Sequence, residues 1–341
     1  MNIAVLGAGA WGSAIASSFA AAACTPQHHV TLWGREADVI AQLQHHRINQ
    51  RYLPDITLDA SLRYNDDLDA VLSAHHAPDD LLILATPIAG LRDICRKIAA
   101  HNQQTNGMPA AVIWLCKGVE RDTHLFPHQI VRAELARNTP FGVLSGPSFA
   151  QEVAQKMPCA LVLASHFDAL DLRFVQQLSN PYLRIYHSTD VIGVELGGAH
   201  KNVLAIAAGI SDGLKLGMNA RAALLTRGIA EMRRFANALG ANPDTISGLT
   251  GVGDLILTAT GDLSRNRTVG LQLATGKALD DITAQLGHVA EGALCAHAML
   301  ALAHEHNVRA PITQGVCAIL DGVAPQKVIE QLLVRDAISE H

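Results

Sequence analysis

Short apolar runs alternate with longer mixed segments over roughly the first half of the chain. Each run is too short for a buried helix, which favours β-strands. The expected strands are Asn2–Leu6, Val30–Trp33, Leu81–Ala85, Ala111–Leu115, Gly142–Leu144, Ala160–Ala164 and, less clearly marked, Arg184–Tyr186. Strands that alternate with helical segments indicate βα units, so we expect an α/β fold with a Rossmann-like, doubly wound, mostly parallel sheet.

Beyond about Ser188 the pattern changes to helical periodicity. Ala, Leu, Glu and Arg dominate segments such as Ala222–Leu239, Ala293–His306 and Pro325–Val334, and these residues are good helix formers. We therefore expect an α/β domain over residues 1–188 and an all-helical domain over residues 189–341. Because no long linker separates them, we expect the two domains to pack closely, with a cleft between them.

Composition excludes several classes of protein. The chain has 341 residues, more than the roughly 100–200 of one typical domain, and its net charge is −5 with only 17% charged residues. This balance argues against a disordered chain and against a basic nucleic-acid binder. The longest apolar run, near Val203–Ile210, is shorter than the roughly 20 residues that span a bilayer.

The compartment follows from the N-terminus and the cysteines. The Ala-rich start lacks a cationic segment and is interrupted by Gly7, Gly9 and Gly12, so it reads as folded protein rather than a signal peptide. The six cysteines show no paired spacing, as in proteins of a reducing compartment. We expect a cytoplasmic protein.

A glycine-rich turn follows the first expected strand and leads into a helix of small residues. It reads Gly7-Ala8-Gly9-Ala10-Trp11-Gly12. Gly7 permits the turn, Gly9 lets backbone N–H groups reach a pyrophosphate, and Gly12 lets the helix pack on the strand. The helix N-terminus attracts the anion. The alternative is a glycine-rich turn without a ligand.

Cofactor choice is expected at the end of the second strand, where an acidic side chain would bind the ribose 2′-hydroxyl. Arg35 and Glu36 lie there. Arg35 suits a 2′-phosphate, whereas Glu36 suits a hydroxyl. We expect both NADP(H) and NAD(H) to bind, with NADP(H) preferred.

Two further segments follow strand ends, where doubly wound sheets bind ligands. Lys117 comes after the strand Ala111–Leu115, and Ser148 lies in the sequence SGPSFAQE. Each has a simpler explanation that needs no ligand. Lys117 could be a surface lysine, and Ser148 with Gln151 fits a helix capping box.

The helical half carries three polar groups in apolar or glycine-rich surroundings. Lys201 and Asn202 lie in ELGGAHKNV, and a buried lysine is costly unless it is paired; a lysine that extends to solvent is the alternative. Asp254 and Thr258 are one helical turn apart and share a face. The sequence SRNR, residues 264–267, suits a phosphate or carboxylate, although a solvated loop would look similar.

Metal chemistry is not expected. The 17 histidines include the pairs His45-His46 and His75-His76, but no spaced set of His, Cys and acidic residues typical of a metal site.

Taken together, these motifs resemble the bacterial NAD(P)-dependent sn-glycerol-3-phosphate dehydrogenase family. The match runs in order through GAGAWG, CKGVE, SGPSFAQEVA, ELGGAHKNVLAIAAGI, TRGIAEM, GLTGVGDLILTATGDLSRNRTVG and VAEG, and it covers nearly the whole chain. The resemblance implies interconversion of dihydroxyacetone phosphate and sn-glycerol 3-phosphate, a precursor of glycerophospholipids. It also implies an N-terminal NAD(P)-binding domain, a C-terminal substrate-binding and catalytic domain, and a possible homodimer.

The resemblance also assigns roles to residues, with Lys201 as proton donor and acceptor. Near the reacting carbonyl it places Lys117, Asn202, Asp254 and Thr258. For the substrate it implies Lys117, Gly146, Ser148, Lys201, Asp254, Ser264, Arg265 and Asn266. For the cofactor it implies Gly7, Gly9, Ala10, Trp11, Gly12, Arg35, Lys117, Ala150, Arg265, Val289 and Glu291. His200 departs from the family pattern, which has an apolar residue before the lysine.

Two other functions are compatible with a Rossmann domain joined to helices. One is a 6-phosphogluconate or 3-hydroxyacid dehydrogenase, in which lysine and asparagine are also adjacent on a helix. The other is a non-catalytic NADPH-sensing module. The SRNR and GLTGVGDL sequences argue against the first, and Lys117, Lys201 and Asp254 together argue against the second, because a sensor needs only the glycine-rich turn.

Overall fold

The computed structural model describes residues 1–21, 28–77, 79–105, 111–286 and 291–333. It divides into two compact units. The first contains Met1–Lys117 and Leu125–Glu195, and the second contains Gly118–His124 and Leu196–His341. The domain boundary that we expect after residue 188 stays a prediction.

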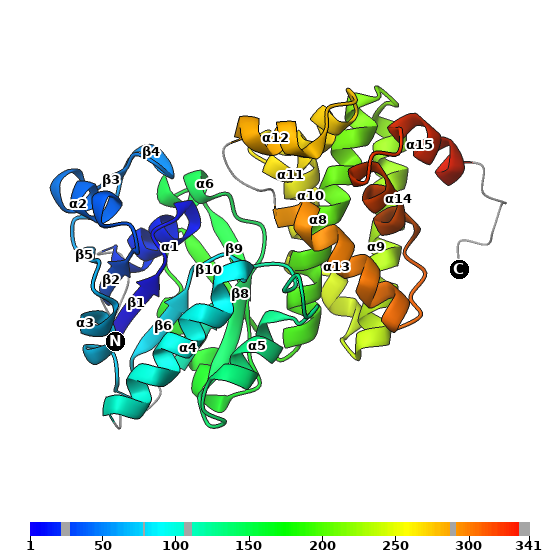
Figure 1. The fold of residues 1–341 in the computed structure, drawn as a ribbon. Helices are drawn as coiled ribbons and strands as arrows, with labels where there is room; N and C mark the ends of the chain where they lie inside the picture. The colour runs from blue at the N-terminus through cyan, green and yellow to red at the C-terminus, as the bar shows by residue number, and fades with distance from the viewer. Residues whose placement is uncertain (22–27, 78, 106–110, 287–290, 334–341) are drawn as a thin grey trace. The chain divides into compact units, whose positions relative to one another are not determined.

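An eight-stranded sheet forms the centre of the first unit (Figure 1), in the order β10-β9-β8-β7-β6-β1-β2-β5. The strands are β1 (Asn2–Leu6), β2 (His29–Trp33), β5 (Arg63–Asn65), β6 (Leu81–Leu84), β7 (Ala111–Trp114), β8 (Phe141–Ser145), β9 (Cys159–Ala164) and β10 (Leu183–Ser188). Every neighbouring pair is parallel except β8 with β9. From β1 the chain extends one way to β2 and β5 and the other way to β6, β7 and β8. The predicted doubly wound, mostly parallel sheet is confirmed.

All seven predicted strands are present, and their ends differ from the predicted ones by at most two residues. The edge strand β5 was not predicted, since its sequence Arg-Tyr-Asn has no apolar run. A separate antiparallel hairpin of β3 (Ile48–Asn49) and β4 (Leu53–Thr57) was not predicted either. All of these strands are short and none contains a continuous apolar run, so hydrophobic patterning carries little signal for them.

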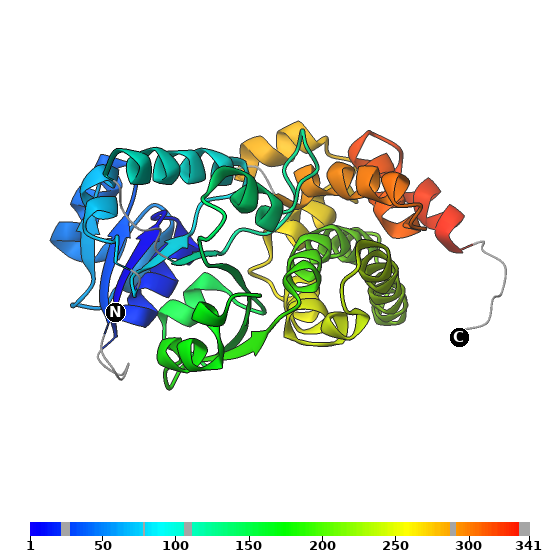
Figure 2. The same ribbon diagram turned by 90° about the horizontal axis from the view of Figure 1, so that it is seen from below.

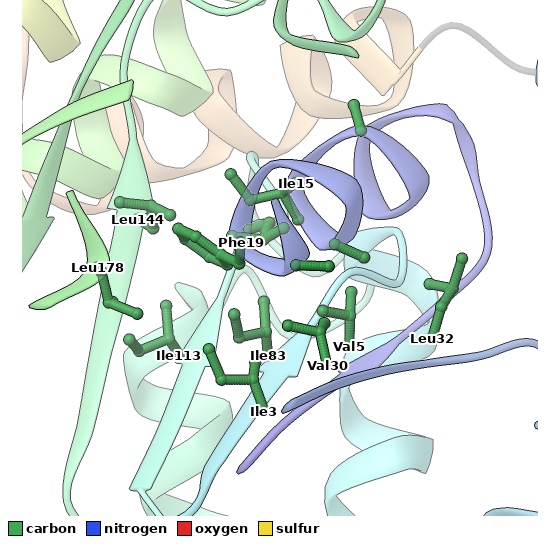
Figure 3. Packing of buried hydrophobic residues seen from close by; sticks show 14 of the residues in the cluster. Ile3, Val5, Ile15, Phe19, Val30, Leu32, Ile83, Ile113, Leu144 and Leu178 are labelled. Carbon is green, nitrogen blue, oxygen red and sulfur yellow. The ribbon is translucent and has the colours of Figure 1, made fainter. Parts of the chain in front are cut away.

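Two apolar cores cover the two faces of the sheet, because successive strand residues point to opposite sides. Ile3 and Val5 face one core, and Ala4 and Leu6 face the other. Figure 3 shows the first core, where Phe19 of the first helix lies over the strand residues. The helices of this unit are α1 (Ala10–Ala20), α2 (Ala37–His46), α3 (Leu68–Ser73), α4 (Ile88–Thr105), α5 (Pro127–Glu134), α6 (Ala150–Ala154) and α7 (Leu172–Leu178), with a short 3₁₀ turn at Asp168–Leu170.

From Leu196 onward, the regular elements of the second unit that the structure describes are all helical, as predicted. It contains most of α8 (Val191–Gly213), then α9 (Met218–Leu239), a 3₁₀ turn (Pro243–Ser247), a π-type turn (Leu249–Gly253), α10 (Asp254–Thr260), α11 (Arg265–Leu273), α12 (Leu279–Leu286), α13 (Glu291–Glu305), α14 (Pro311–Leu320) and α15 (Pro325–Leu333). Figure 2 views α8 (green) and α9 (yellow-green) nearly along their axes, side by side. Among the described residues, no helix combines the length and hydropathy needed to cross a membrane.

Glycines let α8 and α11 cross at very short distance. A Cβ atom on Gly209 of α8 would lie 2.1 Å from the carbonyl oxygen of Arg267, and one on Gly270 of α11 would lie 2.1 Å from that of Ile206. Real Cβ atoms do not approach backbone so closely, so any side chain at either position would push the helices apart. This crossing fixes the start of α11 against α8.

Replacing Gly270 with Ala is expected to destabilise the protein by about 2–3 kcal/mol, because the added methyl overpacks the crossing. Urea unfolding measures the change. The matched control is Gly90→Ala on α4, where the added methyl would have only an ordinary contact at 3.5 Å from Thr86 and should be neutral or stabilising by about 0.5–1 kcal/mol. Equal effects of the two substitutions would contradict this account of the crossing.

Candidate functional site

The glycine-rich turn at the end of β1 leaves space in front of the N-terminus of α1. Gly7 has φ +132°, and a Cβ there would lie 2.7 Å from the carbonyl oxygen of Ala85. A Cβ on Gly12 would lie 1.9 Å from the carbonyl oxygen of Gly7. The fold itself therefore requires both. Gly9, the N-cap of α1, has nothing within 4 Å of its Cβ position, so this open space suits the pyrophosphate of a dinucleotide.

The other cofactor candidates of the first unit also lie near the carboxyl ends of strands. Trp11 is half-buried at the start of α1, Arg35 is exposed after β2, and Ala150 is half-buried at the start of α6. Because β1, β2, β7 and β8 run parallel, these segments meet at one edge of the sheet. Glu291 begins α13 in the second unit, and Val289 lies outside the described residues.

Lys117, Gly146 and Ser148 are brought together after β7 and β8. The Lys117 ammonium donates to the carbonyl oxygen of Gly146 at 3.2 Å, and the Ser148 hydroxyl donates to the same oxygen at 3.1 Å. Gly146 has φ +144°, and its Cβ position is only 3.1 Å from the carbonyl oxygen of Ala160. The half-buried lysine is therefore held by the loop and does not extend freely into solvent.

The capping box that Ser148 and Gln151 could form is absent. Helix α6 begins at Ala150, and its N-cap is Phe149, which makes no side-chain cap. The Ser148 hydroxyl turns back to Gly146 instead. The simple structural explanation for this sequence is therefore wrong, and the hydroxyl lies beside Lys117 because both bond to one carbonyl.

Lys201 is buried and paired in the second unit. Its Nζ lies 2.5 Å from Oδ1 of Asp254 and 2.9 Å from Oγ1 of Thr258, and the Thr258 hydroxyl donates to the backbone carbonyl of Asp254 at 2.7 Å. Only 7% of Lys201 and none of Asp254 is exposed. The alternative of a lysine that extends to solvent is excluded. A buried ammonium held by a carboxylate and a hydroxyl has a fixed direction, as proton transfer requires.

Two glycine contacts bring Asp254 within reach of Lys201. A Cβ on Gly197 of α8 would lie 2.4 Å from the carbonyl oxygen of Thr250, and one on Gly251 would lie 1.9 Å from that of Ile246. The π-type turn that leads into α10 therefore packs directly on α8, one helical turn before Lys201. This close approach places the Asp254 carboxylate beside the ammonium.

A hydrogen bond joins the amides of buried Asn202 and half-buried Asn266. Nδ2 of Asn266 donates to Oδ1 of Asn202 at 2.9 Å, and the Gly292 N–H donates to Oδ1 of Asn266 at 3.2 Å. Arg265, the first residue of α11, is exposed. Ser264 is the N-cap of α11, where its hydroxyl accepts from the Arg267 N–H at 3.2 Å. The start of α11 thus presents a guanidinium and helix N–H groups, a combination suited to a phosphate.

An ion-pair cluster holds the start of α11 on its neighbours. Oδ2 of Asp212 accepts from Arg267 Nε at 3.0 Å, from Arg267 Nη2 at 2.9 Å and from Arg221 Nη1 at 2.9 Å. Local sequence patterns do not reveal this cluster, because its members are separated by up to 55 residues. It leaves Arg265, rather than Arg267, as the exposed arginine of the SRNR sequence.

His200, adjacent to Lys201, belongs to a separate buried network. Its Nε2 lies 2.8 Å from Oγ1 of Thr313, whose hydroxyl donates to Oε1 of Glu231 at 2.6 Å. Glu231 also accepts from the backbone N–H groups of Ile312 and Thr313 at the start of α14. Burial favours the neutral carboxyl, but bonds and charge from His200, Thr313 and Ile312 outweigh it and hold the pKa of Glu231 below its ordinary value.

The described residues contain no group of three or more His, Cys, Asp or Glu side chains arranged to hold a metal ion.

Comparison with known proteins links both halves of the chain to one family. The model for the N-terminus of NAD-dependent glycerol-3-phosphate dehydrogenase matches residues 2–170, and the model for its C-terminus matches residues 190–330. A glycerol-3-phosphate dehydrogenase (NAD(P)+) from Burkholderia cenocepacia strain HI2424 is 55% identical over 342 residues, with 100% of each chain covered.

Solved structures agree with this assignment. The crystal structure of glycerol-3-phosphate dehydrogenase from Coxiella burnetii is 37% identical with a TM-score of 0.88, covering 98% of this chain and 99% of that one. A glycerol-3-phosphate dehydrogenase from Saccharomyces cerevisiae is 26% identical with a TM-score of 0.81, at the same coverage. The match therefore extends over both units.

Replacing Glu231 with Gln is expected to destabilise the protein at pH 7 by about 1–3 kcal/mol, because α14 loses a charged cap. Since the folded pKa of Glu231 is lowered, its contribution is present above the unfolded carboxyl pKa and is lost as pH falls through the folded value. The difference from wild type should therefore shrink below about pH 4. Urea unfolding at several pH values measures this, with the exposed Glu330→Gln as control. Wild-type stability of Glu231→Gln at pH 7 would contradict the network.

Proposed function

Because the chain belongs to the NAD-dependent glycerol-3-phosphate dehydrogenase family, we propose that Lys201 is the acid–base group of its reaction. The chain is an NAD(P)-dependent oxidoreductase that interconverts dihydroxyacetone phosphate and sn-glycerol 3-phosphate, the precursor of glycerophospholipids. The observation that carries the residue assignment is the buried Lys201 ammonium, paired with Asp254 and Thr258. A stable fold does not need such a lysine at this position, whereas proton transfer to a ketone oxygen does.

The residues around the glycine-rich turn fit the nicotinamide cofactor, which supplies or accepts the hydride when it is bound. Backbone N–H groups at the start of α1 would bind the pyrophosphate beside Gly9. Ala10, Trp11, Gly12 and Ala150 would line the cofactor, and Arg35 would bind the adenosine end. In the second unit, Glu291 at the start of α13 and Val289 before it would complete the cofactor contacts.

In the reducing direction, Lys201 protonates the oxygen on C2 of the substrate as negative charge develops there. The Asp254 carboxylate offsets the positive charge of the buried ammonium, and the Thr258 hydroxyl helps to fix its direction. In the oxidising direction the same Nζ accepts the proton from the C2 hydroxyl. The proton thus moves between one nitrogen and one oxygen, with no further base required.

Lys117 adds a second positive charge that stabilises the developing oxyanion. Its ammonium is already held by the Gly146 carbonyl, so little reorganisation accompanies the reaction. Gly146 and Ser148 are assigned to the substrate, because the loop that holds Lys117 consists of these residues.

The phosphate of the substrate binds at the start of α11. Arg265 supplies the guanidinium, and Ser264 and Asn266 supply neighbouring polar groups. The Asn266 amide is joined to Asn202, the residue next to Lys201. Phosphate binding is therefore coupled mechanically to the segment that carries the acid–base group, which positions the carbonyl for transfer.

The family match also decides between the alternatives from sequence. A 6-phosphogluconate or 3-hydroxyacid dehydrogenase and an NADPH sensor both share the fold, but both halves of the chain match glycerol-3-phosphate dehydrogenase.

We further propose a cytoplasmic homodimer without a nucleic-acid partner. The described cysteines are free thiols, and burial raises the pKa of Cys295 to about 12, as for unreactive thiols in a reducing compartment. The net charge of −5 gives little attraction to a polyanion. The mass from light scattering tests the dimer.

Replacing Lys201 with Ala is expected to lower kcat by about two to three orders of magnitude, the size of effect when one stabilising donor is removed from a transition state. NADPH oxidation with dihydroxyacetone phosphate measures it. The exposed Lys97→Ala is the control. Because the substitution leaves Asp254 buried without its ammonium, circular dichroism and NADPH binding should confirm folding, and Thr258→Val should show a smaller loss. A folded Lys201→Ala protein with most of its turnover would remove Lys201 from the role.

Replacing Arg265 with Ala is expected to raise KM for dihydroxyacetone phosphate by about 10- to 100-fold, the cost of a charged hydrogen bond to phosphate. The kcat value should change far less, and NADPH affinity should fall slightly. Steady-state kinetics measure both, with the exposed Arg173→Ala as control. A change in NADPH affinity alone would show that Arg265 does not bind the substrate phosphate.

A further inference from the structure

Both carboxylate oxygens of Glu36 are already occupied at the end of β2. Arg51 Nη1 lies 2.9 Å from Oε1, and the Tyr52 hydroxyl lies 2.8 Å from Oε2. Arg51 also binds Asp38, with Nη2 2.7 Å from Oδ2. The Glu36 side chain is 38% exposed and that of Arg51 is 47% exposed, so the group lies at the surface, where a ligand can reach it.

The turn that carries Arg51 is fixed to the glycine-rich turn. Asn49, only 1% exposed, directs Nδ2 to the carbonyl oxygen of Ala8 and to the hydroxyl of Ser13, both at 2.8 Å. Its Oδ1 accepts from the Tyr52 N–H at 3.2 Å. The β3–β4 hairpin is therefore joined by a buried amide to the segment that would hold the pyrophosphate. The position of Arg51 relative to the cofactor segment is set by the fold rather than by a mobile loop.

The charged groups at this strand end differ in whether they can bind a ligand, because, among the described residues, the acidic side chains are paired and Arg35 is not. Asp38 and Glu36 both pair with Arg51. Arg35 is exposed and has no ion pair among the residues that the structure describes. A free carboxylate here would accept hydrogen bonds from the 2′- and 3′-hydroxyls of a ribose and would repel a 2′-phosphate. Arg51 and Tyr52 remove that possibility by holding Glu36.

We propose that Arg51 is a determinant of cofactor specificity, which favours NADP(H) over NAD(H) by sequestering the Glu36 carboxylate and leaving Arg35 to bind the 2′-phosphate. The inference rests on the proposed function, because it requires that a nicotinamide dinucleotide binds at this strand end. Arg51 acts through Glu36, so it is a positioning residue for specificity rather than a contact to the nucleotide.

Removing Arg51 should release Glu36 and change the discrimination between the two cofactors. Arg51→Ala is expected to weaken NADP+ binding and to strengthen NAD+ binding, lowering the ratio of the two affinities by about fivefold, the upper range for a partly exposed charge pair. Isothermal titration with each nucleotide, without substrate, measures the ratio directly. The effect should diminish at high salt, because the groups are exposed.

A double-mutant cycle separates sequestering from direct contact. In a Glu36→Gln background there is no carboxylate to release. Adding Arg51→Ala should therefore leave the ratio of NADP+ to NAD+ affinity within about twofold of that background. The control is Arg96→Ala, an exposed arginine that pairs with Glu134 on another helix of the same unit, and it should leave the ratio unchanged. If Arg51→Ala weakens NADP+ binding equally with and without the Glu36 carboxylate, Arg51 contacts the nucleotide and the inference is overturned.

The remaining outcomes distinguish this inference from the proposed function. A wild-type protein that binds neither nucleotide would contradict the proposed function itself. A wild-type protein that binds NADP+ and NAD+ but whose affinity ratio is unaffected by Arg51→Ala would overturn the role of Arg51 and leave the dehydrogenase assignment intact. A wild-type preference for NAD+ would likewise overturn the inference alone.

Discussion

A buried ammonium is stable only where a counter-charge and hydrogen-bond acceptors are already in place. Lys201 meets this requirement with Asp254 and Thr258, which lie more than 50 residues away in the sequence. The packing of the second unit brings these residues together. Glycine contacts seat the π-type turn on α8, so that the carboxylate reaches Nζ. Close backbone packing thus positions the Lys201 side chain against Asp254, and the hydrogen bonds to Asp254 and Thr258 fix its direction.

In the first unit, the candidate binding groups follow several different strands and lie at one edge of the sheet. Parallel strands place them there without any special contact, because their carboxyl ends all face the same way. The glycine-rich turn, Arg35 and Lys117 each follow such a strand. Fine adjustment then comes from local hydrogen bonds: the Gly146 carbonyl holds Lys117, and Asn49 joins the β3–β4 hairpin to the turn. In the specificity mechanism that we propose, cofactor choice depends on such local bonds, because Arg51 and Tyr52 of the hairpin turn bond to the Glu36 carboxylate.

Hydrophobic patterning predicted the parts of the fold that are buried on both sides. The central strands are continuous apolar runs, so their positions were found to within one or two residues. The edge strand β5 and the β3–β4 hairpin were missed because they are short and contain no continuous apolar run, so pairing with a neighbour, rather than hydrophobic patterning, identifies them as strands. The prediction of a capping box at Ser148 was wrong because local sequence does not determine the partner of a hydroxyl. In the folded loop the Ser148 hydroxyl donates to the Gly146 carbonyl instead of capping α6.

The sequence by itself determined the fold class, the candidate chemistry and the family, because these depend on residue types at fixed spacings along one chain. Only the tertiary structure decided which charges meet. In the folded chain Lys201 pairs with Asp254, and Glu36 pairs with Arg51. Arg267 pairs with Asp212, whereas Arg265 is exposed. The physical reason is that the energy of a charge depends on its distance to partners and on its burial, and neither quantity exists until segments far apart in the chain have packed together.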